Sequence, residues 1–332
     1  MQQSKTDWTP VLLLGLMANA MLRSRTGYWS RPGLLLAGIS ALVLAAAAAL
    51  FSYGWKHGRW TILRRLLCAL LASSSVLEIL RLRSLYESLY PGTMGLAATC
   101  FVLLFPVIYL RREPSLRQTS GAVLSLLLVG LAVMLVSIAP RLSVTNLQVT
   151  ALTAQDWRDA ATAQLVLYPE YLLLGVLPRQ SDSRAPALRL SVAAVFFEAG
   201  IHFLLELFFG AAMPGRSSPV QAAAQCGALS IFNRLEWLQL ILWSMAVSVK
   251  LAVYLYAMVV LPGGEPGSGN TAVGLDRFFW YLAGALVFCV LWRNVNLEQA
   301  FLWRNLLVWL FALPVLLGGI CQWLFACKKK PA

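Results

Sequence analysis

Long apolar blocks, separated by short segments that carry charges, prolines or glycines, run through the whole chain. A helix needs about 20 apolar residues to cross the ~30 Å hydrocarbon core of a membrane, and most of the blocks are close to that length. We therefore predict an all-α integral membrane protein in which residues 1–332 form a single polytopic domain. The predicted transmembrane helices, about ten in number, cover residues 11–22, 33–53, 62–80, 94–110, 120–139, 160–178, 187–212, 235–261, 276–292 and 304–326.

The predicted spans divide into two sets of five, over residues 11–139 and 160–326, with opposite topologies in the membrane. The opening span of each set is irregular, because the first is short and carries Gly15 and Asn19, and the sixth is interrupted by Pro169. Interrupted helices at corresponding positions of two halves indicate a transporter-type binding site near the membrane midplane. The pattern therefore predicts two inverted pseudo-repeats.

The composition supports the membrane interpretation. Hydrophobic residues make up 59% of the chain and charged residues only 12%, whereas roughly a quarter of the residues of a soluble domain are charged. The net charge of +13 is assigned to basic residues that flank membrane helices, and we predict no nucleic-acid partner. With the N-terminus inside, the inward segments hold 15 Lys and Arg residues against 11 in the outward segments, which predicts a multi-pass protein with both termini in the cytoplasm.

The N-terminal apolar segment allows two interpretations. Ala18, Asn19 and Ala20 resemble the cleavage site of a signal peptide. However, Asp7 follows Lys5 and weakens the positive start that such a peptide needs. We therefore interpret residues 11–22 as a short first membrane helix.

A lysine near the middle of the eighth predicted span is the most unusual feature of the chain. At 100° per residue, Gln239, Trp243, Lys250 and Tyr254 share one face of that helix. Charges at this depth are costly and face the interior of a helix bundle, where they find partners. Two interpretations remain open: Lys250 forms a structural ion pair, or it is a fixed cation that replaces or gates a coupling ion.

The seventh predicted span carries a second polar stripe, because Glu198, His202 and Glu206 recur every four residues. Such a stripe suits a proton relay or pairing between helices, with Lys250 as one candidate partner. The chain has only two histidines, too few for the ligand set of a typical zinc site, and we predict no metal site. In the third span, Glu78 is expected to pair with a nearby arginine, Arg81 or Arg83.

The segment YPEYLL in the sixth predicted span joins a helix interruption to a carboxylate. Pro169 lacks a backbone N–H and frees an upstream carbonyl, and Glu170 adds a charge beside it. Freed backbone groups at membrane depth persist where protein or a cavity satisfies them. We expect either a pocket for a small zwitterionic ligand or a proline kink with a packed glutamate. The predicted pocket residues are Gly15, Ala18, Asn19, Tyr168, Pro169, Glu170, Trp243 and Tyr254.

The sequence lacks the common catalytic and nucleotide-binding motifs of soluble enzymes. It contains no GxSxG, no GxxxxGK[ST] and no HExxH segment. We therefore predict no catalytic residues, no cofactor and no enzymatic activity, although a membrane-embedded enzyme that acts on lipid stays a second alternative.

The segment SIFNRLEWLQLILWSMAVSVKLAVYLYA resembles the eighth helix of the permease-like B subunits of GerA-type nutrient germinant receptors. The resemblance rests on Arg234, Leu235, Glu236, Trp243, Val249, Lys250, Leu255, Tyr256 and Ala257. The segment LYPEYLLLGVLP is similar to the FPFGE helix of that family, with Pro169 and Glu170 as counterparts. The family's phenylalanine and glycine at this interruption are missing here.

This resemblance implies the amino acid/polyamine/organocation permease superfamily and its five-plus-five, leucine-transporter-like fold. It implies a spore germination protein of the spore inner membrane that senses a small nutrient, typically an amino acid. It further implies a larger A-type membrane subunit and a C-type lipoprotein subunit as partners. A proton-coupled amino acid transporter of the same superfamily is the first alternative.

Overall fold

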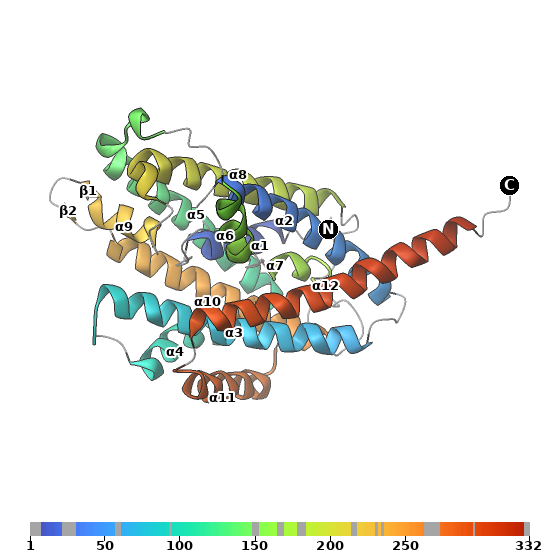
Figure 1. The fold of residues 1–332 in the computed structure, drawn as a ribbon. Coiled ribbons are helices and arrows are strands. Elements are labelled where there is room, and N and C mark those ends of the chain that lie inside the picture. The colour runs from blue at the N-terminus through green and yellow to red at the C-terminus, as the bar shows by residue number, and fades with distance from the viewer. Residues whose placement is uncertain are drawn as a thin grey trace, which may run out of the picture.

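The structure is a computed structural model and is almost entirely helical in the residues that it describes (Figure 1). These are residues 8–21, 31–56, 61–92, 95–147, 153–164, 169–177, 184–213, 218–229, 232–233, 236–261, 273–294 and 296–328. The α-helices are α1 (Thr9–Met21), α2 (Arg31–Lys56), α3 (Thr61–Leu89), α4 (Leu96–Leu104), α5 (Glu113–Ile138), α6 (Ala154–Gln164), α7 (Glu170–Leu173), α8 (Arg184–Phe209), α9 (Pro219–Cys226), α10 (Glu236–Val260), α11 (Leu275–Leu291) and α12 (Leu297–Lys328).

Short 3-10 helices and one pair of strands complete these elements. The 3-10 helices are η1 (Phe105–Ile108), η2 (Ala139–Arg141), η3 (Val144–Asn146) and η4 (Gly210–Ala212). The strands β1 (Ala228–Leu229) and β2 (Phe232–Asn233) form a small antiparallel ladder before α10.

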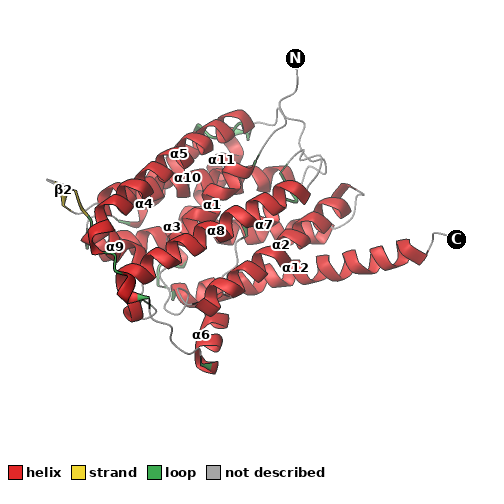
Figure 2. Cartoon of the chain, turned by 90° about the horizontal axis from the view of Figure 1, so that it is seen from above, coloured by secondary structure: helices red, strands yellow, loops and turns green. Residues whose placement is uncertain are grey.

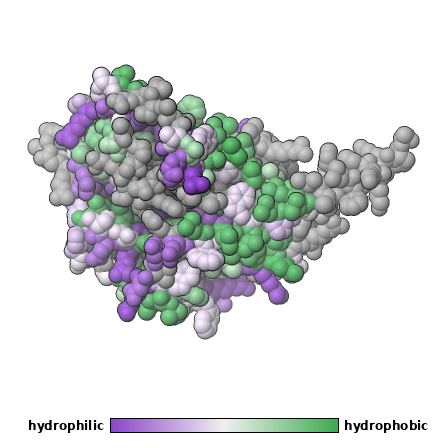
Figure 3. Space-filling view, viewed as in Figure 1, coloured by the Kyte–Doolittle hydropathy of each residue, from purple (hydrophilic) through white to green (hydrophobic). Residues whose placement is uncertain are grey.

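Five helices of the described chain are long and apolar enough to cross a membrane. Their apolar segments are Arg31–Phe51, Glu113–Arg141, Arg189–Phe209, Glu236–Val260 and Gln299–Gly318. Two shorter apolar helices cover Thr9–Met21 and Leu96–Ile108. The structure thus agrees with an all-α membrane protein. The outer surface carries hydrophobic patches, the larger ones in Figure 3 toward the side from which α12 extends.

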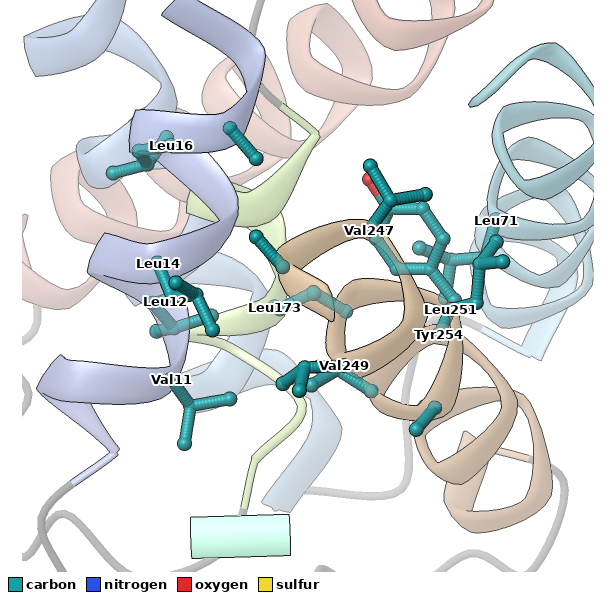
Figure 4. Close-up of a cluster of buried hydrophobic side chains, with 14 of the residues drawn as sticks. Val11, Leu12, Leu14, Leu16, Leu71, Leu173, Val247, Val249, Leu251 and Tyr254 are labelled. Atoms are coloured by element: carbon teal, nitrogen blue, oxygen red, sulfur yellow. The ribbon is translucent and has the colours of Figure 1, made fainter. Parts of the chain in front are cut away.

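Helix α10 forms the centre of the bundle, since 83% of its apolar segment is buried. It packs against α1, α3, α4 and α5. Figure 4 shows part of this packing: Leu71 of α3 lies beside Leu251 of α10, and Leu14 of α1 and Leu173 of α7 lie on the other side of α10. Lys250 of this helix is 2% exposed, so its side chain lies among the neighbouring helices.

The other helices surround this centre in two groups. Helix α1 packs against α5, α7 and α8, and α2 packs against α6, α7, α8 and α12. Helix α3 contacts α11 and α12, while α4 contacts α11. In both ribbon views α12 continues beyond the bundle toward the C-terminus (Figure 1 and Figure 2).

The sixth predicted span, over residues 160–178, is not one continuous helix. Helix α6 ends at Gln164, and a single helical turn, α7, begins at Glu170 with Pro169 at its N-cap. After α7 the chain passes very close to α2, because a β-carbon at Gly175 would lie 2.6 Å from the carbonyl oxygen of Ala48. Only glycine fits such an approach, which fixes the interrupted segment against α2.

Three further elements differ from the predicted spans. Helix α3 continues to Leu89, beyond the predicted end at residue 80, because Glu78 and Arg81 are buried inside the bundle rather than placed at a helix end. Helix α6 begins inside the polar linker that precedes residue 160, and α9 with the β1–β2 ladder lies between the seventh and eighth spans. Short polar or mixed helices lack the long apolar run on which the spans were predicted.

Candidate functional site

A cluster of charged and polar side chains lies in the core of the bundle, where five helices meet. It comprises Asn19 of α1, Glu78 and Arg81 of α3, Glu170 of α7, Lys250 and Tyr254 of α10, and Arg304 of α12. All of these residues are at most 6% exposed. We refer to this set as the central cluster.

Lys250 connects the two carboxylates of the central cluster. Its Nζ lies 2.9 Å from Oε1 of Glu78 and 2.9 Å from Oε1 of Glu170. The same ammonium donates a hydrogen bond of 2.5 Å to Oδ1 of Asn19. The ammonium thus has partners on three different helices, α3, α7 and α1. The lysine predicted to face the bundle interior does so.

Glu170 receives three partners although it sits on a helix of a single turn. Besides Lys250, Asn19 Nδ2 donates to its Oε2 at 2.8 Å and the Tyr254 hydroxyl donates to its Oε1 at 2.5 Å. Its Cγ lies 2.9 Å from the position that a β-carbon at Gly15 would occupy. The absence of a side chain at residue 15 thus allows the carboxylate to lie directly against α1.

Glu78 contacts the same ammonium as Glu170 and has two further cationic neighbours. Arg81 Nη2 lies 3.1 Å from Glu78 Oε2, and Arg304 Nη1 lies 3.5 Å from Glu78 Oε1. Both guanidinium groups also lie over the ring of Phe301, at 5.6 Å and 4.8 Å from its centroid. The predicted pairing of Glu78 with Arg81 is present, but its role is wider than a local pair near a helix end.

The central cluster combines three cationic side chains with two carboxylates. Lys250, Arg81 and Arg304 face Glu78 and Glu170, which leaves a formal excess of one positive charge. Burying charges is costly unless each finds partners with good geometry. The excess makes this position attractive to one further negative charge, such as the carboxylate of a small ligand.

The structure brings together most residues of the predicted pocket. Asn19, Glu170 and Tyr254 belong to the central cluster, and Gly15 lies against Glu170. The carbonyl oxygen of Ala18 accepts a long hydrogen bond, 3.5 Å, from Arg81 Nη2. Pro169 is buried and precedes Glu170 as the N-cap of α7. Tyr168 lies outside the described residues.

Trp243 is placed differently from the other predicted pocket residues. It is 2% exposed and belongs to the apolar core around α10. Within the described residues its indole Nε1 has no hydrogen-bond partner. Trp243 is therefore a buried donor on the same helix as Lys250, seven residues before it.

The polar stripe of α8 forms a separate site at the α2–α8 contact. Glu206 Oε1 lies 2.5 Å from Arg31 Nη2, and Glu206 Oε2 lies 3.9 Å from Nε2 of His202. Glu198 and His202 are buried, at 5% and 6% exposed. Of the acids suggested as partners of Lys250, Glu206 thus pairs with α2, and the described partners of Lys250 are Glu78 and Glu170.

Phe301 and Arg304 belong to the site but were not predicted, and Glu78 was expected only to pair with a nearby arginine, Arg81 or Arg83. Arg304 follows the helix start at residue 297 and looks in the sequence like an ordinary flanking arginine of an apolar span. In the structure Arg304 and Asn305 are at most 2% exposed, which the apolar run that follows them in the sequence does not indicate.

The comparisons with known proteins do not assign a family. No protein-family model matches the sequence, and no curated protein matches it.

Proposed function

We propose that this chain has the five-plus-five inverted-repeat fold, with α1–α5 and α6–α12 as its two halves. In this assignment the interrupted segment α6–α7 corresponds to α1. The remaining helices correspond in chain order: α2 to α8, α3 to α10, α4 to α11 and α5 to α12. The proposal is supported by helix contacts that occur in matching pairs. The contact of α1 with α8 matches that of α2 with α6 and α7, and the contact of α5 with α10 matches that of α3 with α12.

Further pairs agree with this assignment. The contact of α3 with α11 matches that of α4 with α10. In addition, three pairs of corresponding helices contact each other: α2 with α8, α3 with α10, and α4 with α11. The contacts of α1 with α5, α1 with α10 and α2 with α12 have no counterpart of comparable extent in the other half. The matched pairs nevertheless support two related halves and, with them, ten membrane segments that include short ones such as α1.

We further propose that the chain is the permease-like subunit of a nutrient germinant receptor and binds a small polar nutrient such as an amino acid. The observation that carries this proposal is the position of Lys250, whose ammonium bridges Glu170 of the interrupted segment to Glu78 of the continuous helix α3. In the proposed fold, the first helix and the interrupted sixth segment frame the ligand, and both supply groups to this lysine.

The central cluster suggests how binding would become a signal. A ligand carboxylate compensates the excess positive charge, and a ligand ammonium competes with Lys250 for Glu170. Either contact changes the restraint between α7 and α3, and a ligand shifts the protein toward the conformation to which it binds more tightly. In the receptor, A-type and C-type subunits in the spore inner membrane would receive this change, with both termini of this chain in the cytoplasm.

Ligand-dependent thermal stability of the purified protein in detergent micelles tests the binding step. With the common amino acids added singly, at least one is expected to raise Tm in proportion to the logarithm of its concentration above Kd. Lys250→Met should lose this shift, and Ser248→Ala, a buried change two residues away on the other face of α10, should keep it. An equal shift in all three proteins, or none with any amino acid, contradicts the proposal.

Co-expression tests the receptor assignment separately. An A-type and a C-type subunit encoded beside the gene for this chain are expected to co-purify with it from solubilised membranes. Absence of a complex would contradict the receptor role while leaving the ligand site intact.

A proton-coupled amino acid transporter is the second candidate, favoured by the direct contact of Lys250 with Glu170, since a proton passed between such groups can be coupled to ligand binding. Proteoliposomes separate the two functions. Uptake of a radiolabelled amino acid driven by a pH gradient would establish transport, whereas binding without accumulation would reject it.

A further inference from the structure

A groove of about 650 Å³ lies between α1, α5 and α8, on a different side of α1 from the central cluster. Its wall from α8 includes Arg189, Val192, Ala193, Phe196 and Phe197, which follow the i, i+3, i+4, i+7 and i+8 spacing of one helix face. Helix α1 contributes Leu13 and Met17, one turn apart, and α5 contributes Leu128. Among the described residues that line it, the groove is apolar except for Arg189.

The charged residue lies at the end of the groove that corresponds to the membrane surface. The apolar segment of α8 begins at Arg189, so this arginine marks the boundary between the hydrocarbon core and the interface. From Arg189 to Phe197 the helix rises by about 12 Å. This depth approaches half of the ~30 Å hydrocarbon core, which is the thickness available to one acyl chain of one leaflet.

We propose that this groove binds one anionic phospholipid, with an acyl chain along the apolar wall and the phosphate at Arg189. Val192 and Phe196 are 57% and 80% exposed, so the wall of α8 is open to a lipid that enters from the side. A guanidinium group pairs with phosphate through two parallel hydrogen bonds, and basic residues beside membrane helices select anionic lipids.

The charge pattern favours a lipid over a second copy of the chain. Another helix would present an apolar face along the whole groove and would leave the Arg189 guanidinium without an anion. A phospholipid supplies an anion at one end and a hydrocarbon chain along the rest, which is the order found between Arg189 and Phe197. The expected orientation of the chain also places Arg189 on the cytoplasmic side, where anionic lipids are enriched.

A lipid in this groove would contact the helix that also forms the central cluster. Leu13 and Gly15 are two residues apart, and so are Met17 and Asn19, which places the members of each pair on nearly opposite faces of α1. The lipid therefore packs on one face of α1 while Glu170 packs on the other. The binding itself does not depend on the function proposed above.

Native mass spectrometry of the purified protein with dioleoylphosphatidylglycerol and dioleoylphosphatidylcholine tests the proposal. The wild-type protein should retain one phosphatidylglycerol molecule in preference to phosphatidylcholine. Arg189→Gln should reduce that preference roughly five-fold, as expected for one arginine near an anionic headgroup. Ala193→Trp, which fills the groove, should remove retention of both lipids.

Two control variants distinguish the groove from the rest of the surface. Arg141→Gln removes an exposed arginine of η2, and Val287→Trp adds an indole to the exposed face of α11, where Val287 is 56% exposed. Both should behave as the wild type. Retention that is equal in all five proteins, or a dimer that Ala193→Trp dissociates without any bound lipid, would overturn the proposal.

Discussion

Glu170 reaches the central cluster because residue 15 is a glycine. A β-carbon at Gly15 would lie 2.9 Å from Glu170 Cγ, closer than side-chain carbons approach in proteins. The carboxylate of Glu170 is held by Asn19, Tyr254 and Lys250, so the side chain cannot move away from residue 15 without breaking these contacts. The glycine and the glutamate are 155 residues apart in the chain, and together they bring α7 against α1.

Gly15→Ala is therefore expected to destabilise the protein. In an ordinary helix the change from glycine to alanine stabilises by about 0.5–1 kcal/mol, whereas overpacking a well-packed core costs about 1–3 kcal/mol. At Gly15 the second effect should dominate, and Tm measured in detergent should fall.

Gly121→Ala is the matched control for this change. Gly121 lies inside α5, and a β-carbon there would meet nothing within 4 Å. Its Tm should stay the same or rise. Equal behaviour of the two alanine variants would mean that Glu170 does not lie against α1.

The sequence was sufficient to predict the helical class and the positions of most long helices. Apart from the sixth, each apolar span corresponds largely to helix in the described residues, because burial in lipid and burial in protein both need continuous apolar runs. The interior position of Lys250 was also predictable, because an ammonium group in the middle of an apolar span is much less costly inside the helix bundle than in contact with lipid. The number of membrane crossings was not, because short helices such as α1 and the interrupted sixth span do not follow from composition.

The partners of Lys250 could not be derived from the sequence in the same way. Several acids of the predicted spans were candidates, and only the positions of α3 and α7 in the structure bring Glu78 and Glu170, rather than Glu206, to Lys250. Arg304 was missed for a related reason. An arginine near a helix start is assigned to the membrane surface unless a buried carboxylate on another helix is known to face it.

Tyr254→Phe should weaken the packing of α7 without changing the charge of the central cluster. The tyrosine hydroxyl donates to Glu170 at 2.5 Å, and hydrogen bonds to charged groups contribute about 1.5–3 kcal/mol. We expect a loss of this order in the free energy of unfolding. Tyr109→Phe, at a residue that is 71% exposed, should cause no comparable loss.

The first turn of α6, which precedes the predicted sixth span, offers a test outside the membrane-spanning segments. Thr153 and Asp156 bond reciprocally: Thr153 N donates to Asp156 Oδ2 at 2.7 Å, and Asp156 N donates to Thr153 Oγ1 at 3.2 Å. This is a capping box. The backbone and hydroxyl donors of Thr153 hold the pKa of Asp156 below its ordinary value.

The lowered pKa of Asp156 determines how the stability of the α6 cap changes with pH. Because the pKa is lower in the folded state, the cap is fully formed at neutral pH and is lost in acid, as the pH falls below the ordinary aspartate value. Hydrogen exchange of the α6 amides, corrected for the intrinsic effect of pH, should therefore show less protection in acid. Asp156→Asn should remove most of this pH dependence, and Arg158→Gln, an exposed change in the same helix, should retain it.

Glu78 and Lys250 should respond very differently to neutral substitution, although they form one ion pair. Glu78→Gln leaves Lys250, Arg81 and Arg304 with a single carboxylate, and removal of one partner from a buried charge network costs about 3–5 kcal/mol. We expect this variant to be lost from the membrane or to unfold at much lower temperature.

Lys250→Met should instead leave a folded protein. Glu78 keeps both arginines, Glu170 keeps its hydrogen bonds from Asn19 and Tyr254, and the excess positive charge disappears. Methionine also replaces the apolar stem of the lysine at similar length. Membrane abundance and Tm should therefore stay closer to the wild type than in Glu78→Gln, while the amino-acid response is abolished. If Lys250→Met is depleted from the membrane as severely as Glu78→Gln, the lysine forms a structural ion pair. A cation that only contacts the ligand would be dispensable for folding.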